Sequence, residues 1–142
     1  MIVAVYDANI LASGLLTSTT PPGQILDAWR RGQVTLIVSE HILSELAGVL
    51  QKAYFRSRLV AGEAERFLEA LRQDAVLTPI TVEVQGVATH PEDDLVLATA
   101  VSDQADYLVT GDGPLRRQVP GYRGVRLVTA REFVELLARD RP

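Results

Sequence analysis

The chain has 142 residues, of which 47% are hydrophobic and 23% are charged, and it contains no cysteine. This balance is that of an ordinary globular protein, and the absence of cysteine excludes disulfide bonds and thiolate metal sites. The formal net charge of −4 argues against tight, non-specific binding of nucleic acid, which normally relies on a basic surface.

The pattern along the chain predicts a single domain over residues 1–142. A chain of this length buries roughly two-thirds of its unfolded surface, and no repeat, low-complexity tract or linker divides it. The apolar run Ile2–Tyr6 is too short for a signal peptide or a membrane span. We therefore expect no membrane association, and the lack of cysteine suits a reducing, cytoplasmic location.

The first half of the chain alternates strand-like and helix-like patterns. The predicted elements are a buried strand at 2–6, a helix at 24–31, a strand at 35–38 and a helix at 39–51. Gly32 ends the first of these helices, and Ser39 is a suitable cap for the second.

The second half continues the alternation. The predicted elements are a helix at 61–75, a strand at 76–84 that Pro79 interrupts, a helix at 92–102, strands at 107–110 and 126–128, and a last helix from Thr129. Thr129 and Glu132 have the spacing of a capping box. Strands that alternate with helices predict an α/β fold, with a parallel sheet covered by helices on both faces.

Two acidic residues follow predicted strands. Asp7 comes directly after the first strand, and Asp112 lies just past the strand YLVT, in the sequence TGDG. In a parallel sheet, ligands bind outside the carboxyl ends of the strands. We therefore expect both carboxylates at the same edge of the sheet.

Two helical acids are predicted to face that edge as well. Glu45 borders the apolar stripe of the helix at 39–51, and Asp94 shares a face with the apolar positions three, four and seven residues later. Four carboxylates in one place would raise one another's pKa and destabilise the fold. A hard divalent cation such as Mg²⁺ or Mn²⁺ removes that penalty, and it supports chemistry at a phosphodiester. The pattern thus indicates a metal site.

Each acid also has a purely structural interpretation. Asp7 is suited to capping the turn after the first strand, with Asn9 forming a local side-chain bond. Glu45 would be a solvated helix residue, and Asp94 a first-turn acid favoured by the helix dipole. Asp112 with the following glycine is a common turn dipeptide. A coincidence of all four is harder to accept than any one of these interpretations.

The remaining candidates are weaker. His41 and His90, the only histidines, lack the spacing of a zinc motif, and we expect surface or structural roles for them. A phosphotransferase of the haloacid dehalogenase type needs an acid where Asn9 stands. A receiver domain needs a lysine late in the chain, whereas the only lysine is Lys52.

A resemblance to the PIN-domain family runs through essentially the whole chain, in VYDANILASGLL, VSEHILSEL, PEDDLVLATAVSDQADYLVTGDGPL and LVTAREFVELL. It is closest to the compact bacterial and archaeal toxin components of toxin–antitoxin systems, akin to VapC-type toxins. The resemblance implies a three-layer α/β/α sandwich around a mostly parallel sheet. It also implies Mg²⁺- or Mn²⁺-dependent cleavage of RNA.

The resemblance assigns residues as well. The family's four catalytic and metal-binding acids fall on Asp7, Glu45, Asp94 and Asp112. Its small polar residue two after the first acid falls on Asn9, and Thr110 matches a threonine that orients carboxylates or water. Asp93 is a further supporting candidate. His90 departs from the pattern, because close relatives often carry an acid ahead of the proline.

The favoured function is therefore a metal-dependent endoribonuclease that is the toxin of a toxin–antitoxin pair. The resemblance implies an RNA substrate, a cognate antitoxin protein and a homodimer as partners. The alternative is a catalytically silent RNA-binding or regulatory PIN module. The intact set of acids argues against this alternative, and the low basic content argues against strong RNA binding without metal.

Overall fold

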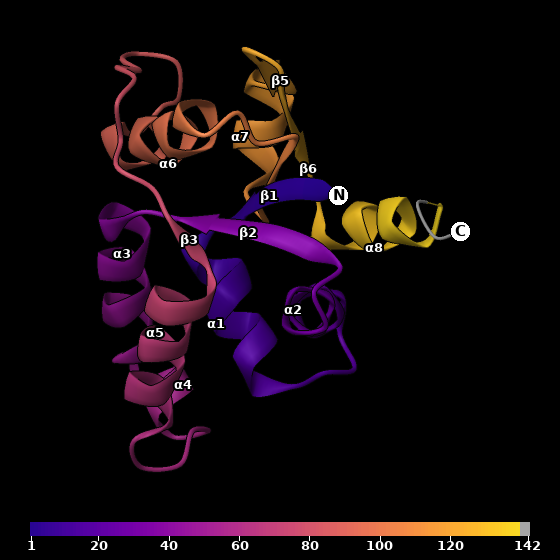
Figure 1. The fold of residues 1–142 in the computed structure, drawn as a ribbon. Helices are drawn as coiled ribbons and strands as arrows, with labels where there is room; N and C mark the ends of the chain where they lie inside the picture. Colours follow the sequence, from indigo (N-terminus) through magenta and orange to yellow (C-terminus); the bar gives the residue numbers. More distant parts are fainter. Residues whose placement is uncertain (140–142) are drawn as a thin grey trace.

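A computed structural model describes residues 1–139 of the protein (Figure 1). Its centre is one six-stranded sheet with the strand order β3-β2-β1-β4-β6-β5. The strands are β1 (Ile2–Tyr6), β2 (Val34–Val38), β3 (Val76–Leu77), β4 (Tyr107–Val109), β5 (Gly121–Tyr122) and β6 (Val125–Val128). All neighbouring strands are parallel except β5, which pairs antiparallel with β6.

Helices cover both faces of the sheet. They are α1 (Ala8–Leu16), α2 (Pro21–Arg30), α3 (Glu40–Leu50), α4 (Ala53–Arg56), α5 (Glu63–Asp74), α6 (Pro91–Ser102), α7 (Gly113–Gln118) and α8 (Ala130–Arg139). Figure 1 shows α1, α2, α3 and α5 on one side of the sheet, and α6 and α7 on the other. The predicted three-layer α/β/α sandwich with a mostly parallel sheet is thereby confirmed. None of the described helices is long and apolar enough to cross a membrane.

Tyr6, the last residue of β1, joins the central strand to the helices on one face. Its side chain is only 1% exposed, and its hydroxyl donates a hydrogen bond of 2.9 Å to the Ile25 carbonyl in α2. Its ring meets the fully buried Phe133 ring of α8 edge to face, with the centroids 5.8 Å apart. This aromatic contact and hydrogen bond hold α2 and α8 against β1.

The structure contains elements that the sequence analysis did not predict. Helix α1 begins immediately after β1, where the sequence analysis assigned no element, and Asp7 caps it by accepting a bond from the Ala8 amide. The short elements α4, α7 and β5 were also missed, because two to six residues are too few to show a hydrophobic period.

The strand predicted at 76–84 is much shorter than expected. Only Val76–Leu77 pairs with β2. Beyond Pro79, which has no amide N–H to donate, the amides of Thr81 and Val82 bond the Ser102 hydroxyl at the end of α6. The chain therefore leaves the sheet and crosses to the other face, where it leads into α6.

We predict that Tyr6→Phe lowers the free energy of unfolding by about 1 kcal/mol, because it removes the buried hydrogen bond between the Tyr6 hydroxyl and the Ile25 carbonyl. Urea denaturation measures the difference. Tyr107→Phe is the matched control, since Tyr107 also packs against Phe133, with 5.7 Å between the centroids, but its hydroxyl has no hydrogen bond within residues 1–139. Equal losses in the two variants would contradict the role given to the Tyr6 hydroxyl.

Candidate active site

The site is built where the strand order of the sheet reverses. From β1 the chain proceeds to β2 on one side, whereas β4 lies on the other side of β1 and is followed by β6. A crevice for ligands forms at the carboxyl ends of strands at such a switch point. The Asp7 amide bonds the Val109 carbonyl at 2.9 Å, so the two strand ends lie directly together.

A pocket of about 440 Å³ opens at this point, which we call the acid pocket. It is lined by Asp7, Ala8, Asn9, Glu45, Val49, Asp93, Gly111 and Asp112. Its four carboxylates come from the end of β1, from α3, from the first turn of α6 and from the cap of α7. The fold thus brings together acids that are far apart in the sequence.

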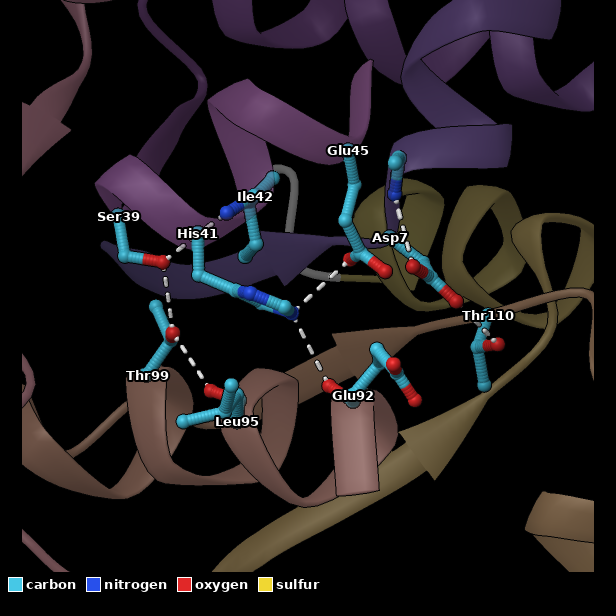
Figure 2. A network of polar contacts seen from close by, with 10 residues as sticks. Asp7, Ser39, His41, Ile42, Glu45, Glu92, Leu95, Thr99 and Thr110 are labelled. Carbon is cyan, nitrogen blue, oxygen red and sulfur yellow. Dashed lines mark hydrogen bonds and ion pairs between the residues drawn. The ribbon is translucent and has the colours of Figure 1, made fainter. Parts of the chain in front are cut away.

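Asp7 lies deepest among these acids. Its Oδ1 accepts a bond of 2.8 Å from the Ala8 amide, and its Oδ2 accepts a bond of 3.0 Å from the Thr110 hydroxyl (Figure 2). Burial raises the pKa of Asp7, and the nearby charge of Asp112 adds to this, while the two hydrogen bonds act in the opposite direction. The two hydrogen bonds thus fix the orientation of the Asp7 carboxylate, while its burial disfavours the charged form.

Thr110 connects two of the acids. Its hydroxyl donates to Asp7 and accepts a bond of 3.1 Å from the Asp112 amide, and its side chain is fully buried. The Arg116 guanidinium donates a bond of 2.8 Å to the Thr110 carbonyl. Thr110, which follows β4, therefore links the end of β4 to Asp7 at the end of β1.

Asp112 serves as the cap of α7 and also faces the pocket. Its Oδ1 accepts a bond of 3.0 Å from the Leu115 amide, as an N-cap residue does. The sequence suggested a turn at this residue; the structure shows a helix cap, and it also places Asp112 in the lining of the acid pocket. Its carboxylate keeps a second oxygen for other partners.

Glu45 reaches the acid pocket from α3. One of its carboxylate oxygens lies 3.3 Å from His41 Nε2, at ion-pair distance. That oxygen, Oε1, is buried and has no hydrogen-bond partner within the described residues. Burial raises the pKa of Glu45, and the charges of Asp7 and Asp93 raise it further against the effect of His41.

A buried chain of hydroxyls sets α3 against α6 (Figure 2). Thr99 donates to the Leu95 carbonyl at 2.9 Å, so Ser39 is the donor in their 2.8 Å contact. Ser39 in turn accepts a bond from the Ile42 amide and so caps α3. Beside this chain, His41 Nε2 lies 3.1 Å from the Glu92 carbonyl oxygen. These contacts position Glu45 over the start of α6.

Asp93 and Asp94 differ from their predicted positions: Asp93, and not Asp94, lines the acid pocket. The structure buries Asp94, which is 6% exposed, and turns it away from the acid pocket. Its two oxygens accept bonds of 3.0 Å from the Gly86 amide and 2.7 Å from the Ala88 amide. The apolar face of α6 does carry Asp94 inward, as predicted, but there it meets the loop that precedes the helix.

Asp93 is the α6 acid that lines the pocket. Burial raises its pKa most, and the charges of Asp7 and Asp112 follow. From the sequence, only a supporting role is predicted for Asp93, because helical periodicity alone does not reveal which structure covers the buried face. The sequence signal that could have placed it is its position at the exposed edge of the first helical turn.

The expected cluster of metal ligands is not preassembled. Within residues 1–139, no three acidic or histidine side chains are grouped closely enough to hold a metal ion. In this structure Asp7 and Asp112 accept hydrogen bonds from amides and a hydroxyl, and Asp94 accepts bonds from the loop before α6. The donor set nevertheless suits Mg²⁺ or Mn²⁺, since it offers mutually repelling carboxylates and the unpartnered Oε1 of Glu45.

Comparison with known proteins agrees with this architecture. The family model described as PIN domain matches residues 3–113, which include all four acids of the pocket. Among curated protein sequences, none matches the chain.

Three solved structures share the fold. VapBC2 from Rickettsia felis, bound to a DNA fragment from its promoter, has a TM-score of 0.58 at 15% identity, over 90% of this chain and 98% of that one. VapC20 from Mycobacterium tuberculosis, a toxin that cleaves the sarcin–ricin loop, has a TM-score of 0.57 at 16% identity, over 87% and 98%. FitAcB from Neisseria gonorrhoeae has a TM-score of 0.52 at 17% identity, over 89% and 97%.

We predict that Asp94→Ala destabilises the fold by about 2 kcal/mol, because two amides lose a charged acceptor. Thermal or urea unfolding measures the loss. Asp74→Ala removes an exposed aspartate at the end of α5 and should leave stability unchanged. If Asp94→Ala is as stable as this control, Asp94 does not anchor the loop.

The stability of Asp93→Asn should improve relative to the wild type as pH rises. Because the folded pKa of Asp93 is raised, the native wild type holds this proton more tightly than the unfolded chain does. Stability present at acid pH is therefore lost as pH rises from the ordinary value of 3.8 through the raised one.

Asparagine does not ionise, so the Asp93→Asn variant does not lose stability in this way. The unfolding free energy of the variant minus that of the wild type should therefore grow from about pH 3 to about pH 7. Denaturation of both proteins across this range measures it. A difference that is constant with pH would show that the surroundings do not disfavour the Asp93 charge.

Proposed function

Because the chain belongs to the PIN domain family, we propose that it is a metal-dependent endoribonuclease, built as one nuclease domain, and the toxin of a toxin–antitoxin pair. The observation that carries this proposal is the acid pocket, where four carboxylates from separate elements surround one space at the switch point of the sheet. The likeness in fold to VapC20, which cleaves the sarcin–ricin loop, supports RNA as the substrate.

Asp7, Glu45, Asp93 and Asp112 are the proposed ligands of Mg²⁺ or Mn²⁺, with Asp93 in the place first assigned to Asp94. A bound divalent cation would activate a water molecule and stabilise the charge that develops on the phosphate. Without compensation, these carboxylates would repel the RNA backbone as well as one another.

The neighbouring residues have defined tasks in this proposal. Thr110 holds the Asp7 carboxylate and the Asp112 amide through one hydroxyl, so it keeps the two acids in register. Asn9 is exposed at the pocket, where its amide is available to donate a hydrogen bond to a phosphate oxygen. His41, one turn before Glu45 in α3, places its Nε2 3.3 Å from the Glu45 carboxylate.

The biological partners follow from the same proposal. A toxin needs a cognate antitoxin, and the likeness to VapBC2 supports one here. A homodimer and a cytoplasmic location remain proposals drawn from the resemblance to VapC-type toxins.

Cleavage of RNA should require a divalent cation and the acids of the pocket. With Mg²⁺ or Mn²⁺ we expect the wild type to cut structured and unstructured RNAs, and EDTA to abolish cutting. Asp7→Asn, Asp93→Asn and Asp112→Asn should each lower the rate by about a hundredfold or more. Gel analysis of end-labelled RNA measures the rates.

Asp94→Asn is the matched comparison for Asp93→Asn. It should lower stability more than Asp93→Asn does, and where it remains folded it should keep more activity. Cleavage that survives EDTA, or that survives the loss of Asp7, would contradict the mechanism. A wild type that binds RNA but cuts none of those tried would favour the silent RNA-binding module instead.

A further inference from the structure

A second, smaller pocket adjoins the acid pocket. It has a volume of about 210 Å³ and shares Asp93 and Asp112 with the acid pocket. The rest of its wall consists of Thr89, His90, Pro114, Leu115 and Gln118. We call this space the side pocket. A molecule that occupies the acid pocket has direct access to it.

The lining of the side pocket suits a planar, uncharged group. Pro114 and Leu115 give it an apolar wall, and His90 offers a ring. None of its described lining residues is a lysine or an arginine, so a phosphate would find no cation there. The volume lies below the roughly 300–1,000 Å³ of pockets that hold whole drug-sized ligands. One ring system fits these limits.

Gln118 provides a directed polar group at the side pocket. The Thr89 hydroxyl donates a bond of 3.0 Å to Gln118 Oε1, and this contact joins the loop before α6 to the end of α7. Its acceptor is thus engaged, while the Nε2 amide has no hydrogen bond within the described residues. Because Gln118 lines the side pocket, its Nε2 donors are available to a molecule that binds there.

We propose that the side pocket binds one base of the RNA strand, next to the phosphate that lies at the acid pocket. This inference rests on the proposed ribonuclease function. Proteins read single-stranded RNA by packing an unstacked base on rings or apolar surfaces and by bonding its edge. Asp93 and Asp112 line both spaces, so a strand whose phosphate lies in one places an adjoining base at the other.

Gln118 is the specificity-determining residue of this subsite. Its free amide donors match a base with a carbonyl oxygen on the bound edge, as in guanine and uracil. Adenine carries an amino group at the position of that oxygen, where it would face the Gln118 donors and leave both donors without a partner. The side pocket therefore selects guanine or uracil over adenine at one position beside the cut.

Sequencing of the cleavage products from an RNA pool with randomised positions tests this selection. The wild type should cut with a preference of about tenfold for guanine or uracil over adenine at one adjoining position. Gln118→Ala should lose the preference, and Thr89→Ala should weaken it. Gln118→Glu, which offers only acceptors, should shift the preference toward adenine or cytosine.

Gln73→Ala is the matched control, because Gln73 is an exposed glutamine on α5 whose amide bonds Glu69. It should keep the wild-type preference. A wild type that cuts without any base preference, or a preference unchanged in Gln118→Ala, would overturn the subsite while leaving the ribonuclease intact.

Binding of nucleotides tests the subsite even if no RNA is cut. In calorimetry with Mn²⁺ present, the wild type should bind guanosine or uridine 5′-monophosphate about tenfold more tightly than adenosine 5′-monophosphate. Gln118→Ala should bind all three equally. Equal affinities in the wild type would refute the side pocket as a base site, whereas absent cleavage with selective binding would refute only the proposed activity.

Discussion

Repulsion among carboxylates at one edge of the sheet is the constraint around which this protein is organised. Asp7, Asp93 and Asp112 come from β1, α6 and the cap of α7, and each charge disfavours another that it faces. A fold selected for stability alone would place neutral side chains there. The protein keeps the acids together, and this cost is explained if a divalent cation binds between them.

The surroundings of the pocket make such crowding tolerable. The Thr110 hydroxyl and the Ala8 amide donate hydrogen bonds to the Asp7 carboxylate, and the Leu115 amide donates one to Asp112. On the opposite wall, the hydroxyl chain from Ser39 to Thr99 joins α3 to α6. Tyr6 secures β1 from beneath through α2 and α8. Hydrogen bonds and packing thus connect the elements that carry the acids of the pocket.

Much of this arrangement was predictable from the sequence, because strand ends and helix periods place side chains by simple geometry. The ends of β1 and β4 correctly located Asp7 and Asp112 at one edge. Helical periodicity did not show that Asp93, and not Asp94, lines the acid pocket. A helical period identifies the buried face, but not that the loop over 86–88 would take up the buried acid. Tertiary contacts of irregular segments leave no periodic trace in the sequence.

Calorimetric titration of Mn²⁺ into the wild type and into Asp7→Asn measures whether a divalent cation binds between the carboxylates, and it needs no assumption about the substrate. We expect saturable binding to the wild type, a melting temperature that rises with Mn²⁺, and the loss of both in Asp7→Asn. A wild type that binds no Mn²⁺, or an Asp7→Asn variant that binds it equally well, would show that the carboxylates of the acid pocket do not hold a divalent cation.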